Sequence, residues 1–291
     1  MTHNEILHET IKALEAVTPL EESMSLRRHS ELPSVDQLRQ MMEHIKGVMF
    51  PRFFGSDLNV DASSIYSILR QQAARGIAFA KKSNTDNAQQ EADALADRFM
   101  QQLPEIKQLL MTDVEAVTQN DPAATDYTEA VFCYPAVLVM TYYRTAHALY
   151  SLGIPVLPRI ITEMAHSATG IDIHPAAQIG THFAIDHGTG VVIGETSIIG
   201  NHVMLYQGVT LGARNFKYDD DGQPLNIPRH PIVEDNVTIY SNTSVLGCIR
   251  IGHDSVIGGN IWLTHDVPPH SRILQHQAEQ RCATEQPTTS N

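Results

Sequence analysis

Cysteine is scarce in this sequence. The 291 residues contain three cysteines, Cys133, Cys248 and Cys282, which lie far apart and form no C-x-x-C pair. Zinc ribbons and disulfide-stapled scaffolds need paired or clustered cysteines, so the spacing argues against both classes. It fits a protein of a reducing compartment.

Positive charge is also limited. The chain has 20 Lys and Arg residues against 33 Asp and Glu, a formal net charge of −13, and no cluster of basic residues. Nucleic-acid surfaces need clustered Lys and Arg. We therefore expect no nucleic-acid partner, although an acidic total leaves room for an anionic ligand at a local site.

Long apolar runs are absent. The N-terminal segment MTHNEILHET has no apolar signal core. The most apolar stretch, VFCYPAVLVMTYY at 131–143, runs into Arg144 and is too short to cross a bilayer. The prediction is a cytoplasmic protein with no membrane partner.

The first part of the chain, residues 1–168, has the apolar spacing of helices. Leu38, Met41, Met42 and Ile45 recur at helical intervals. Further helices are expected over residues 87–103 and 105–119, with Pro104 interrupting them, and over 135–152 and 159–166. We interpret this part as an α-helical oligomerisation domain.

From Ile173 onward, aliphatic residues recur every six positions in three series. The series are Ile173, Ile179, Ile185 and Val191; Ile193, Ile199, Leu205 and Leu211; and Val233, Ile239, Val245, Ile251, Ile257 and Leu263. A period of six fits neither a helix nor an alternating strand, and it is the hexapeptide pattern of a parallel β-helix. Three hexapeptides make one coil of roughly eighteen residues, and stacked coils bury one continuous core. The repeat domain is expected over 169–273, followed by a C-terminal tail at 274–291.

Two breaks interrupt the period. The register slips by two residues between Val191 and Ile193, directly after IDHGTG, where Gly188 and Gly190 permit a change of path. A longer interruption at 212–231 is rich in Gly, Asp, Asn and Pro and predicts an extruded loop that ends in Arg229-His230-Pro231. Loops that leave a rigid scaffold often carry function.

Polar residues near these breaks are candidates for chemistry. Asp172 and His187 are 15 positions apart, which allows them to lie near one another on adjacent coils. A carboxylate beside an imidazole suits a general base. Zinc is the alternative, because His182 and His187 have H-x4-H spacing and His202 follows, as in the γ-class carbonic anhydrases. Zinc needs at least three convergent ligands, and no third histidine stands at a matching position. We therefore expect no metal.

The motifs of the repeat domain resemble a known family. The segment GIDIHPAAQIGTHFAIDHGTGVVIGETSIIGNHVMLYQGVTLGA, with RHP and DVPPH after it, is similar to serine O-acetyltransferase, an enzyme of cysteine biosynthesis. The resemblance is strong over residues 170–270 and weaker over the helical half. It implies a left-handed parallel β-helix after an α-helical domain. It also implies trimers with active sites between protomers, often paired into hexamers.

The resemblance assigns the catalytic pair. His187 matches the base that takes the proton from the serine hydroxyl, and Asp172 matches the carboxylate that holds that imidazole. The hydroxyl oxygen would then attack the thioester of acetyl-CoA directly, giving O-acetylserine and free CoA.

The resemblance also assigns the binding residues. Arg229 and His230 match residues that meet the serine carboxylate, and Asp121 and Asp186 match the carboxylates that receive the ammonium. For the co-substrate acetyl-CoA, the matching or neighbouring positions are Gly212, Ala213, Ser241 and Gly259. Cysteine is expected to inhibit at the serine site.

The sequence departs from the family in its long loop and at its C-terminal residues. The family's loop is commonly short and ends Gly-Gly-Asp-Arg-His-Pro, whereas this loop is long and acidic, with Pro228 before Arg229. Many relatives end in an isoleucine that inserts into O-acetylserine sulfhydrylase, but this sequence ends TTSN, so that complex is not expected.

Two other functions stay open at this point. An acetyltransferase for a sugar or another small hydroxyl compound would share the β-helix and the catalytic histidine. A non-enzymatic oligomeric scaffold would share only the fold. Asp121, Asp186 and Arg229 together favour an amino-acid substrate over the former, and intact Asp172 and His187 argue against the latter.

Overall fold

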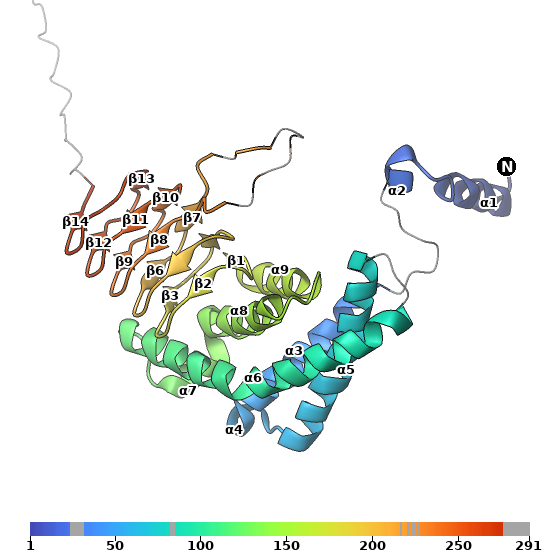
Figure 1. Ribbon diagram of the computed structural model, residues 1–291, viewed down its shortest axis with the longest axis horizontal. Coiled ribbons are helices and arrows are strands. Elements are labelled where there is room, and N and C mark those ends of the chain that lie inside the picture. Colours follow the sequence, from blue (N-terminus) through green and yellow to red (C-terminus); the bar gives the residue numbers. More distant parts are fainter. Residues whose placement is uncertain are drawn as a thin grey trace, which may run out of the picture.

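The computed structural model describes residues 1–23, 32–81, 85–215, 217–219, 222, 225 and 227–275, so most of the predicted tail and part of the loop lie outside it. Most of the helices lie together, and a stack of short strands extends from them (Figure 1). The helices are α1 (His3–Leu14), α2 (Pro19–Ser23), α3 (Val35–Met49), α4 (Pro51–Phe54), α5 (Leu58–Lys81), α6 (Thr85–Asn120), α7 (Tyr127–Cys133), α8 (Pro135–Ser151) and α9 (Leu157–Thr169).

The helical region has its own apolar core, to which α3, α5, α6, α8 and α9 contribute. In α3, Ser34 caps the N-terminus by accepting a hydrogen bond from the Gln37 amide at 3.3 Å. The predicted apolar face of this helix is confirmed, because Leu38 and Met41 and their partners at helical spacing are fully buried. Within the described part of the chain, no helix combines the length and apolar character that a membrane span requires.

Pro104 does not interrupt the helix, so that prediction was wrong. Helix α6 runs unbroken from Thr85 to Asn120 with Pro104 inside it. Proline removes one amide donor and clashes with the preceding turn, which disfavours a helix interior locally. Here Pro104 lies on the exposed side while Leu103 and Ile106 are buried, so packing of the helix outweighs the local penalty.

The remaining helix predictions are confirmed with shifted ends. Helix α8 covers nearly the whole expected apolar segment. Helix α9 is longer at both ends than expected and stops at Gly170, which caps it in the left-handed conformation at φ +72°. Helix α6 ends at Asn120, as expected for a chain that next reaches Asp121-Pro122.

The strands form three parallel sheets that wrap around one core. The strand orders are β1-β4-β7-β10-β13, β11-β8-β5-β2 and β14-β12-β9-β6-β3. The strands are β1 (Asp172–Ile173), β2 (Gln178–Ile179), β3 (Ala184–Asp186), β4 (Val192–Ile193), β5 (Ile198–Ile199), β6 (Met204–Tyr206), β7 (Thr210–Gly212), β8 (Ile232–Val233), β9 (Thr238–Ile239), β10 (Ser244–Leu246), β11 (Arg250–Ile251), β12 (Val256–Ile257), β13 (Trp262–Leu263) and β14 (Arg272–Ile273).

This is the predicted β-helix, and its core is the predicted six-residue series. Every residue of the three series is buried, from Ile173 to Leu263. Each contributes an inward-pointing aliphatic side chain, and the next coil covers it. The predicted class, helices followed by a parallel β-solenoid, is confirmed. The strand pairings do not define whether the β-helix is left-handed or right-handed, so the left-handed coil stays a prediction. The predicted domain boundaries also stay predictions.

The register shows where the repeat is broken. Thr238 pairs with Val256, eighteen residues further on, which is one regular coil. Asp172 pairs with Val192, twenty residues further on, so the first coil contains two extra residues. Thr210 pairs with Ser244 across the long loop. Both predicted breaks therefore leave the stacking intact on either side.

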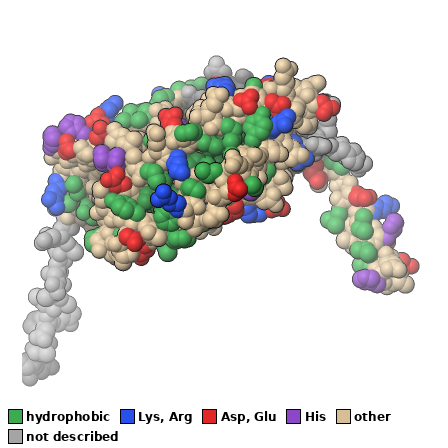
Figure 2. All heavy atoms as spheres, turned by 90° about the horizontal axis from the view of Figure 1, so that it is seen from below, with side chains coloured by type: hydrophobic (Ala, Val, Ile, Leu, Met, Phe, Trp, Pro, Cys, Tyr) green, Lys and Arg blue, Asp and Glu red, His purple; other side chains and the backbone are tan. Residues whose placement is uncertain are grey.

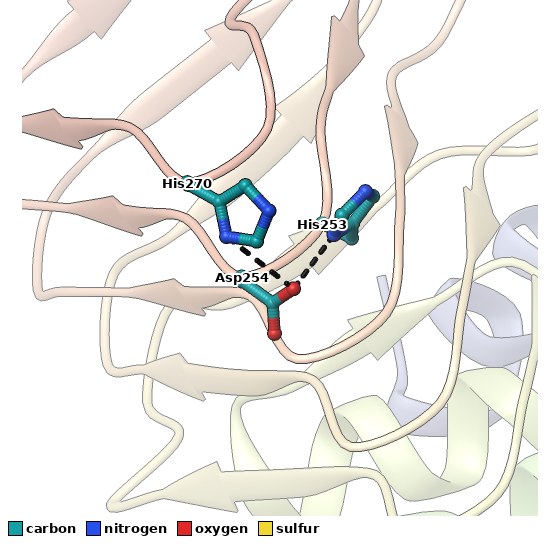
Figure 3. A group of neighbouring side chains, drawn as sticks. All are labelled: His253, Asp254 and His270. Carbon is teal, nitrogen blue, oxygen red and sulfur yellow. Dashed lines mark hydrogen bonds and ion pairs between the residues drawn. The ribbon is translucent and has the colours of Figure 1, made fainter.

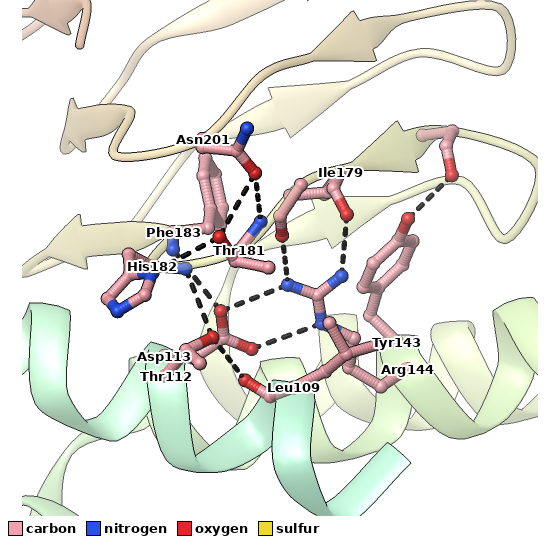
Figure 4. A network of polar contacts seen from close by, with 12 residues as sticks. Leu109, Thr112, Asp113, Tyr143, Arg144, Ile179, Thr181, His182, Phe183 and Asn201 are labelled. Atoms are coloured by element: carbon pink, nitrogen blue, oxygen red, sulfur yellow. Dashed lines mark hydrogen bonds and ion pairs between the residues drawn. The ribbon is translucent and has the colours of Figure 1, made fainter. Parts of the chain in front are cut away.

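A buried ion pair joins the helices to the first coil (Figure 4). Arg144 on α8 and Asp113 on α6 make a fork at 3.0 and 3.1 Å, with side chains 4 % and 1 % exposed. The same guanidinium donates to the Ile179 and Gly180 carbonyls, each at 2.6 Å, and Asp113 accepts from the Phe183 amide at 3.2 Å. The first coil has no coil before it, so Arg144 satisfies edge carbonyls that would otherwise lack partners.

Candidate active site

A cavity of about 330 Å³ lies where the helices meet the first coils. It is lined by Val117, Asp121, Tyr134, Pro135, Ala136, Ile185, Asp186, His187, Thr189 and Met204. The helical region thus provides Asp121, and the solenoid provides Asp186 and His187. Two carboxylates and an imidazole share this cavity with an apolar wall.

His187 stands in the two-residue insertion of the first coil. Its φ is +56°, and Gly188 follows at +84°. The Gly188 amide donates to the Asp186 carbonyl at 2.6 Å, which makes a three-residue turn centred on His187. Several other corners of the solenoid hold a residue at a similar positive φ, among them His182 and His202, so what sets His187 apart is its place in the inserted turn. The turn carries the imidazole out of the coil, where its side chain is 74 % exposed and 3.9 Å from Asp186.

Asp121 follows the C-terminus of α6 and is held from two sides. It accepts a hydrogen bond from the Tyr134 hydroxyl at 2.5 Å and another from the Ala123 amide at 2.8 Å. These hydrogen bonds, with a smaller contribution from His187, lower the pKa of the Asp121 carboxyl. The same contact raises the pKa of Tyr134 to about 12. Asp121 is therefore held in place as an ionised carboxylate, and the Tyr134 hydroxyl stays protonated and donates to it.

Asp172 lies on β1, close to the corner of His187. The Gly190 amide donates to the Gly170 carbonyl at 2.9 Å, so the inserted turn rests on the residues just before Asp172. The ion partner of Asp172 is Arg159, at 3.8 Å. Among the described residues, no hydrogen bond or ion pair joins Asp172 to His187.

Arg229 and His230 lie at a different corner, beyond the far end of β4. The Arg229 guanidinium pairs with Glu195. The Thr196 hydroxyl accepts from the Arg229 amide at 2.9 Å and from the His230 amide at 3.1 Å. The strand between His187 and Glu195 therefore separates this pair from the cavity.

His230 is buried and neutral. Its Nδ1 accepts a hydrogen bond from the Thr196 amide at 3.1 Å, which leaves the ring proton on Nε2. Burial, with the charge of Arg229 adding to it, lowers the pKa of His230 to about 4. The ring lies so close over Gly194 that a Cβ there would stand 2.0 Å from it. Only glycine fits below His230.

The four residues predicted for CoA divide between two edges of the solenoid. Ser241 and Gly259 stack on the edge that also carries His187, where the Asn260 amide donates to the Ser241 carbonyl at 2.9 Å. Gly212 ends β7 on the other edge and leads through Ala213 into the long loop that ends at Arg229. One edge thus holds the imidazole, and the other holds the guanidinium.

Comparison with known proteins decides the family. The family described as "Serine acetyltransferase, N-terminal" matches residues 64–135. The plasmid serine acetyltransferase of Synechococcus elongatus is 45 % identical over 263 residues, which cover 84 % of this chain and 82 % of that protein. The chain belongs to the serine acetyltransferase family. The resemblance noted in the motifs is confirmed, and the protein is an acyltransferase.

Solved serine acetyltransferases share the fold. Isoform 3 from Entamoeba histolytica, in complex with cysteine, aligns with a TM-score of 0.72 at 30 % identity, covering 94 % of this chain and 92 % of that one. A serine acetyltransferase in complex with CoA aligns with a TM-score of 0.56 at 25 % identity, covering 83 % and 95 %. The similarity therefore extends over both the helices and the solenoid.

Around the candidate residues, sequence reasoning missed three partners. Tyr134 fixes Asp121, Glu195 pairs with Arg229, and Thr196 holds His230. Glu195 and Thr196 stand in the recognised GETS segment, but a motif does not say which side chain faces which. Tyr134 precedes Pro135 at the start of α8 and gave no signal of its own.

The histidines weighed for zinc do not converge. His182 and His202 stack on each other with ring centroids 4.3 Å apart, on the edge between β2 and β3. His187 lies beyond β3, on the next edge. The H-x4-H spacing therefore places its two members on different corners of the coil.

Proposed function

We propose that this protein transfers the acetyl group of acetyl-CoA to the hydroxyl of L-serine, giving O-acetylserine and CoA. The observation that carries the proposal is the cavity that brings Asp121, Asp186 and His187 together, with the imidazole on an inserted turn. Family membership supports the substrate over a sugar and argues against a scaffold without catalysis.

In the proposed reaction His187 is the general base. It takes the hydroxyl proton as the serine oxygen bonds to the thioester carbonyl carbon. The carbon–sulfur bond then breaks, and the CoA sulfur leaves with the proton returned from the imidazolium. Asp172 would orient the ring from beneath the inserted turn. No step uses a metal ion.

Serine would be held by charge at both ends. The carboxylates of Asp121 and Asp186 suit its ammonium, and Tyr134 keeps Asp121 ionised and in place. The guanidinium of Arg229 suits its carboxylate. Arg229 and His230 lie on the other edge of the same chain, so we propose that a neighbouring protomer supplies them in a homotrimer, and the helical region then pairs trimers into hexamers.

Mixed oligomers test this division. His187→Ala and Arg229→Ala chains, each expected to have little activity alone at low serine, are co-expressed with different affinity tags, and oligomers carrying both tags are isolated. If sites lie between protomers, a trimer that carries both chains keeps about one third of its sites with both halves intact, and randomly mixed hexamers keep about one quarter, so activity returns to about that fraction. Doubly tagged oligomers with no gain in activity would place each site within one chain and overturn the proposal.

Release of CoA tests the reaction itself. Cleavage of acetyl-CoA is followed at the thioester absorbance with L-serine, L-homoserine, a sugar panel or no acceptor. Cleavage that depends on L-serine and falls on addition of L-cysteine is expected. Cleavage with a sugar alone would keep the fold and refute the substrate, and no cleavage with any acceptor would favour a scaffold.

A further inference from the structure

The far end of the solenoid carries a second group of side chains with metal-binding chemistry (Figure 3). His253 and Asp254 lie in the corner between β11 and β12, and His270 lies in the corresponding corner of the last coil, before β14. The space-filling view shows histidine and acidic side chains gathered at the solenoid end of the molecule (Figure 2). None of these residues takes part in the proposed acetyl transfer.

The three side chains converge on one point. His253 Nδ1 lies 2.6 Å from Asp254 Oδ2, and His270 Nδ1 lies 3.6 Å from the same oxygen. One ligand atom from each residue lies within 4.8 Å of the other two. A tetrahedral ion with bonds of about 2.0–2.2 Å has its ligand atoms about 3.3–3.6 Å apart. Small rotations of the rings and the carboxylate therefore bring all three donors into range.

The backbone holds these positions without a ligand. Asp254 and His270 have φ values of +57° and +58°, fixed by the corners of the coils. The Asp254 amide donates to the Asp235 carbonyl at 3.0 Å, and the His270 amide donates to the His253 carbonyl at 2.8 Å. Stacking of the coils therefore sets the geometry before an ion arrives, which lowers the cost of binding.

The surroundings complete the arrangement. Asn236 donates from Nδ2 to Asp254 Oδ1 at 3.1 Å, and such outer contacts orient metal ligands. The Glu234 carboxylate accepts from the His253 amide at 3.0 Å and so fixes the backbone at His253, while its charge is paired with Arg250 at 2.7 Å. The side chains of His253, Asp254 and His270 are 46 %, 41 % and 71 % exposed, so an ion can enter and keep a water as a further ligand.

We propose that His253, Asp254 and His270 bind a divalent transition-metal ion, with Zn²⁺ as the best match, and that the ion clamps the last two coils together. Two imidazoles and a carboxylate form a donor set that zinc favours. The last coil has a neighbour on one side only, so a bond from His270 to the preceding corner stabilises the end of the solenoid.

A second His-carboxylate group in the described chain is a poorer match. Glu163, His166 and Asp172 also have donor atoms within 4.8 Å of one another. There Arg159 already pairs with Glu163 at 2.5 Å and with Asp172 at 3.8 Å. A resident guanidinium competes with an incoming cation, and only one imidazole is available.

Calorimetric titration with Zn²⁺ tests the proposal on full-length protein freed of metal and carrying no histidine tag. One ion per chain is expected. His253→Ala and His270→Ala should each weaken it at least about 100-fold, because even outer contacts to metal ligands alter affinity 10- to 100-fold. His265→Ala is the matched control, since it removes an exposed imidazole from the same end of the solenoid, outside the cluster, and should leave the affinity unchanged.

Thermal unfolding provides the second readout. Zn²⁺ should raise the melting temperature of the wild type and of His265→Ala but not of His270→Ala, because an ion that binds only the folded state stabilises it. His270→Gln serves in place of His270→Ala if the latter does not fold. Absence of saturable Zn²⁺ binding, or binding that survives loss of either histidine, would overturn the proposal.

Discussion

The helical region and the solenoid carry their parts of the site in different ways. The solenoid repeats one six-residue rule, and two of its candidate residues stand where the rule fails: His187 in the two-residue insertion and Arg229 at the end of the long loop. The helical region has no such repeat, and it supplies Asp121 just past the end of α6. In both regions the regular elements form the scaffold, and His187, Arg229 and Asp121 are proposed to act from its interruptions.

The junction between the two regions is made by buried charged groups that the proposed acetyl transfer does not use. Arg144 and Asp113 are among the most buried charged groups of the described chain, and they meet the first coil through its carbonyls. The cavity with His187 lies on the same side of the first coils but stays open to solvent. A change at the junction should therefore alter unfolding, and a change in the cavity should alter turnover.

The largest effect on turnover is expected from His187→Ala. Loss of a general base should lower kcat by about 10²–10⁴-fold, while the oligomer persists. His202→Ala is the matched control, because His202 also has a positive φ, of +55°, but stacks on His182 away from the cavity. Steady-state kinetics with L-serine measure both. Near-full activity of His187→Ala would refute the assignment of the base.

The largest effect on stability is expected from Arg144→Met. It leaves the Asp113 charge and the Ile179 and Gly180 carbonyls buried without their donor, which should cost about 3–5 kcal/mol of unfolding free energy. Arg250→Met is the control, because it breaks a similar pair with Glu234 in an exposed position and should change stability far less. Denaturant unfolding compares them, and equal effects would contradict the role given to the junction.

The pH dependence of stability should show the lowered pKa of His230, which lies where the long loop rejoins the solenoid. Its pKa is about 4 in the folded chain against about 6.5 unfolded, so the unfolded state binds more protons in between. Neutral His230 therefore contributes about 1–3 kcal/mol to the free energy of unfolding. This contribution is fully present above pH 6.5 and is lost as the pH falls towards 4. His230→Asn should remove this part of the slope. An unchanged slope would show that His230 titrates normally.

The smallest effect is expected at the helical side of the cavity. Tyr134→Phe removes the donor to Asp121 and should raise the KM for serine about 3–10-fold with little change in kcat, because the hydrogen bond orients a binding group. Tyr127→Phe, an exposed change on α7, is the control. A fall in kcat without a change in KM would instead connect Tyr134 with the chemical step.

Much of this architecture could be read from the sequence because it depends on local spacing. The six-residue period marked the aliphatic positions that form most of the solenoid core, although Phe183 and Val267 are buried outside it. Leu38, Met41 and Met42 marked the buried face of α3. The motifs around Asp172 and His187 pointed to the family. The predicted break at Pro104 was wrong. Proline does disfavour a helix interior, but the packing that keeps α6 unbroken comes from residues far away in the sequence.

The sequence by itself determined the coil repeat, the positions of its breaks and the chemical types present at them, since each rests on residues a few positions apart. Only the tertiary structure decided that Asp121 shares a cavity with His187, that Tyr134 holds Asp121, that Arg144 completes the first coil, and that His253 and His270 face one oxygen. These contacts join residues far apart in the chain. Their geometry depends on how helices pack and how coils stack, which no short-range pattern records.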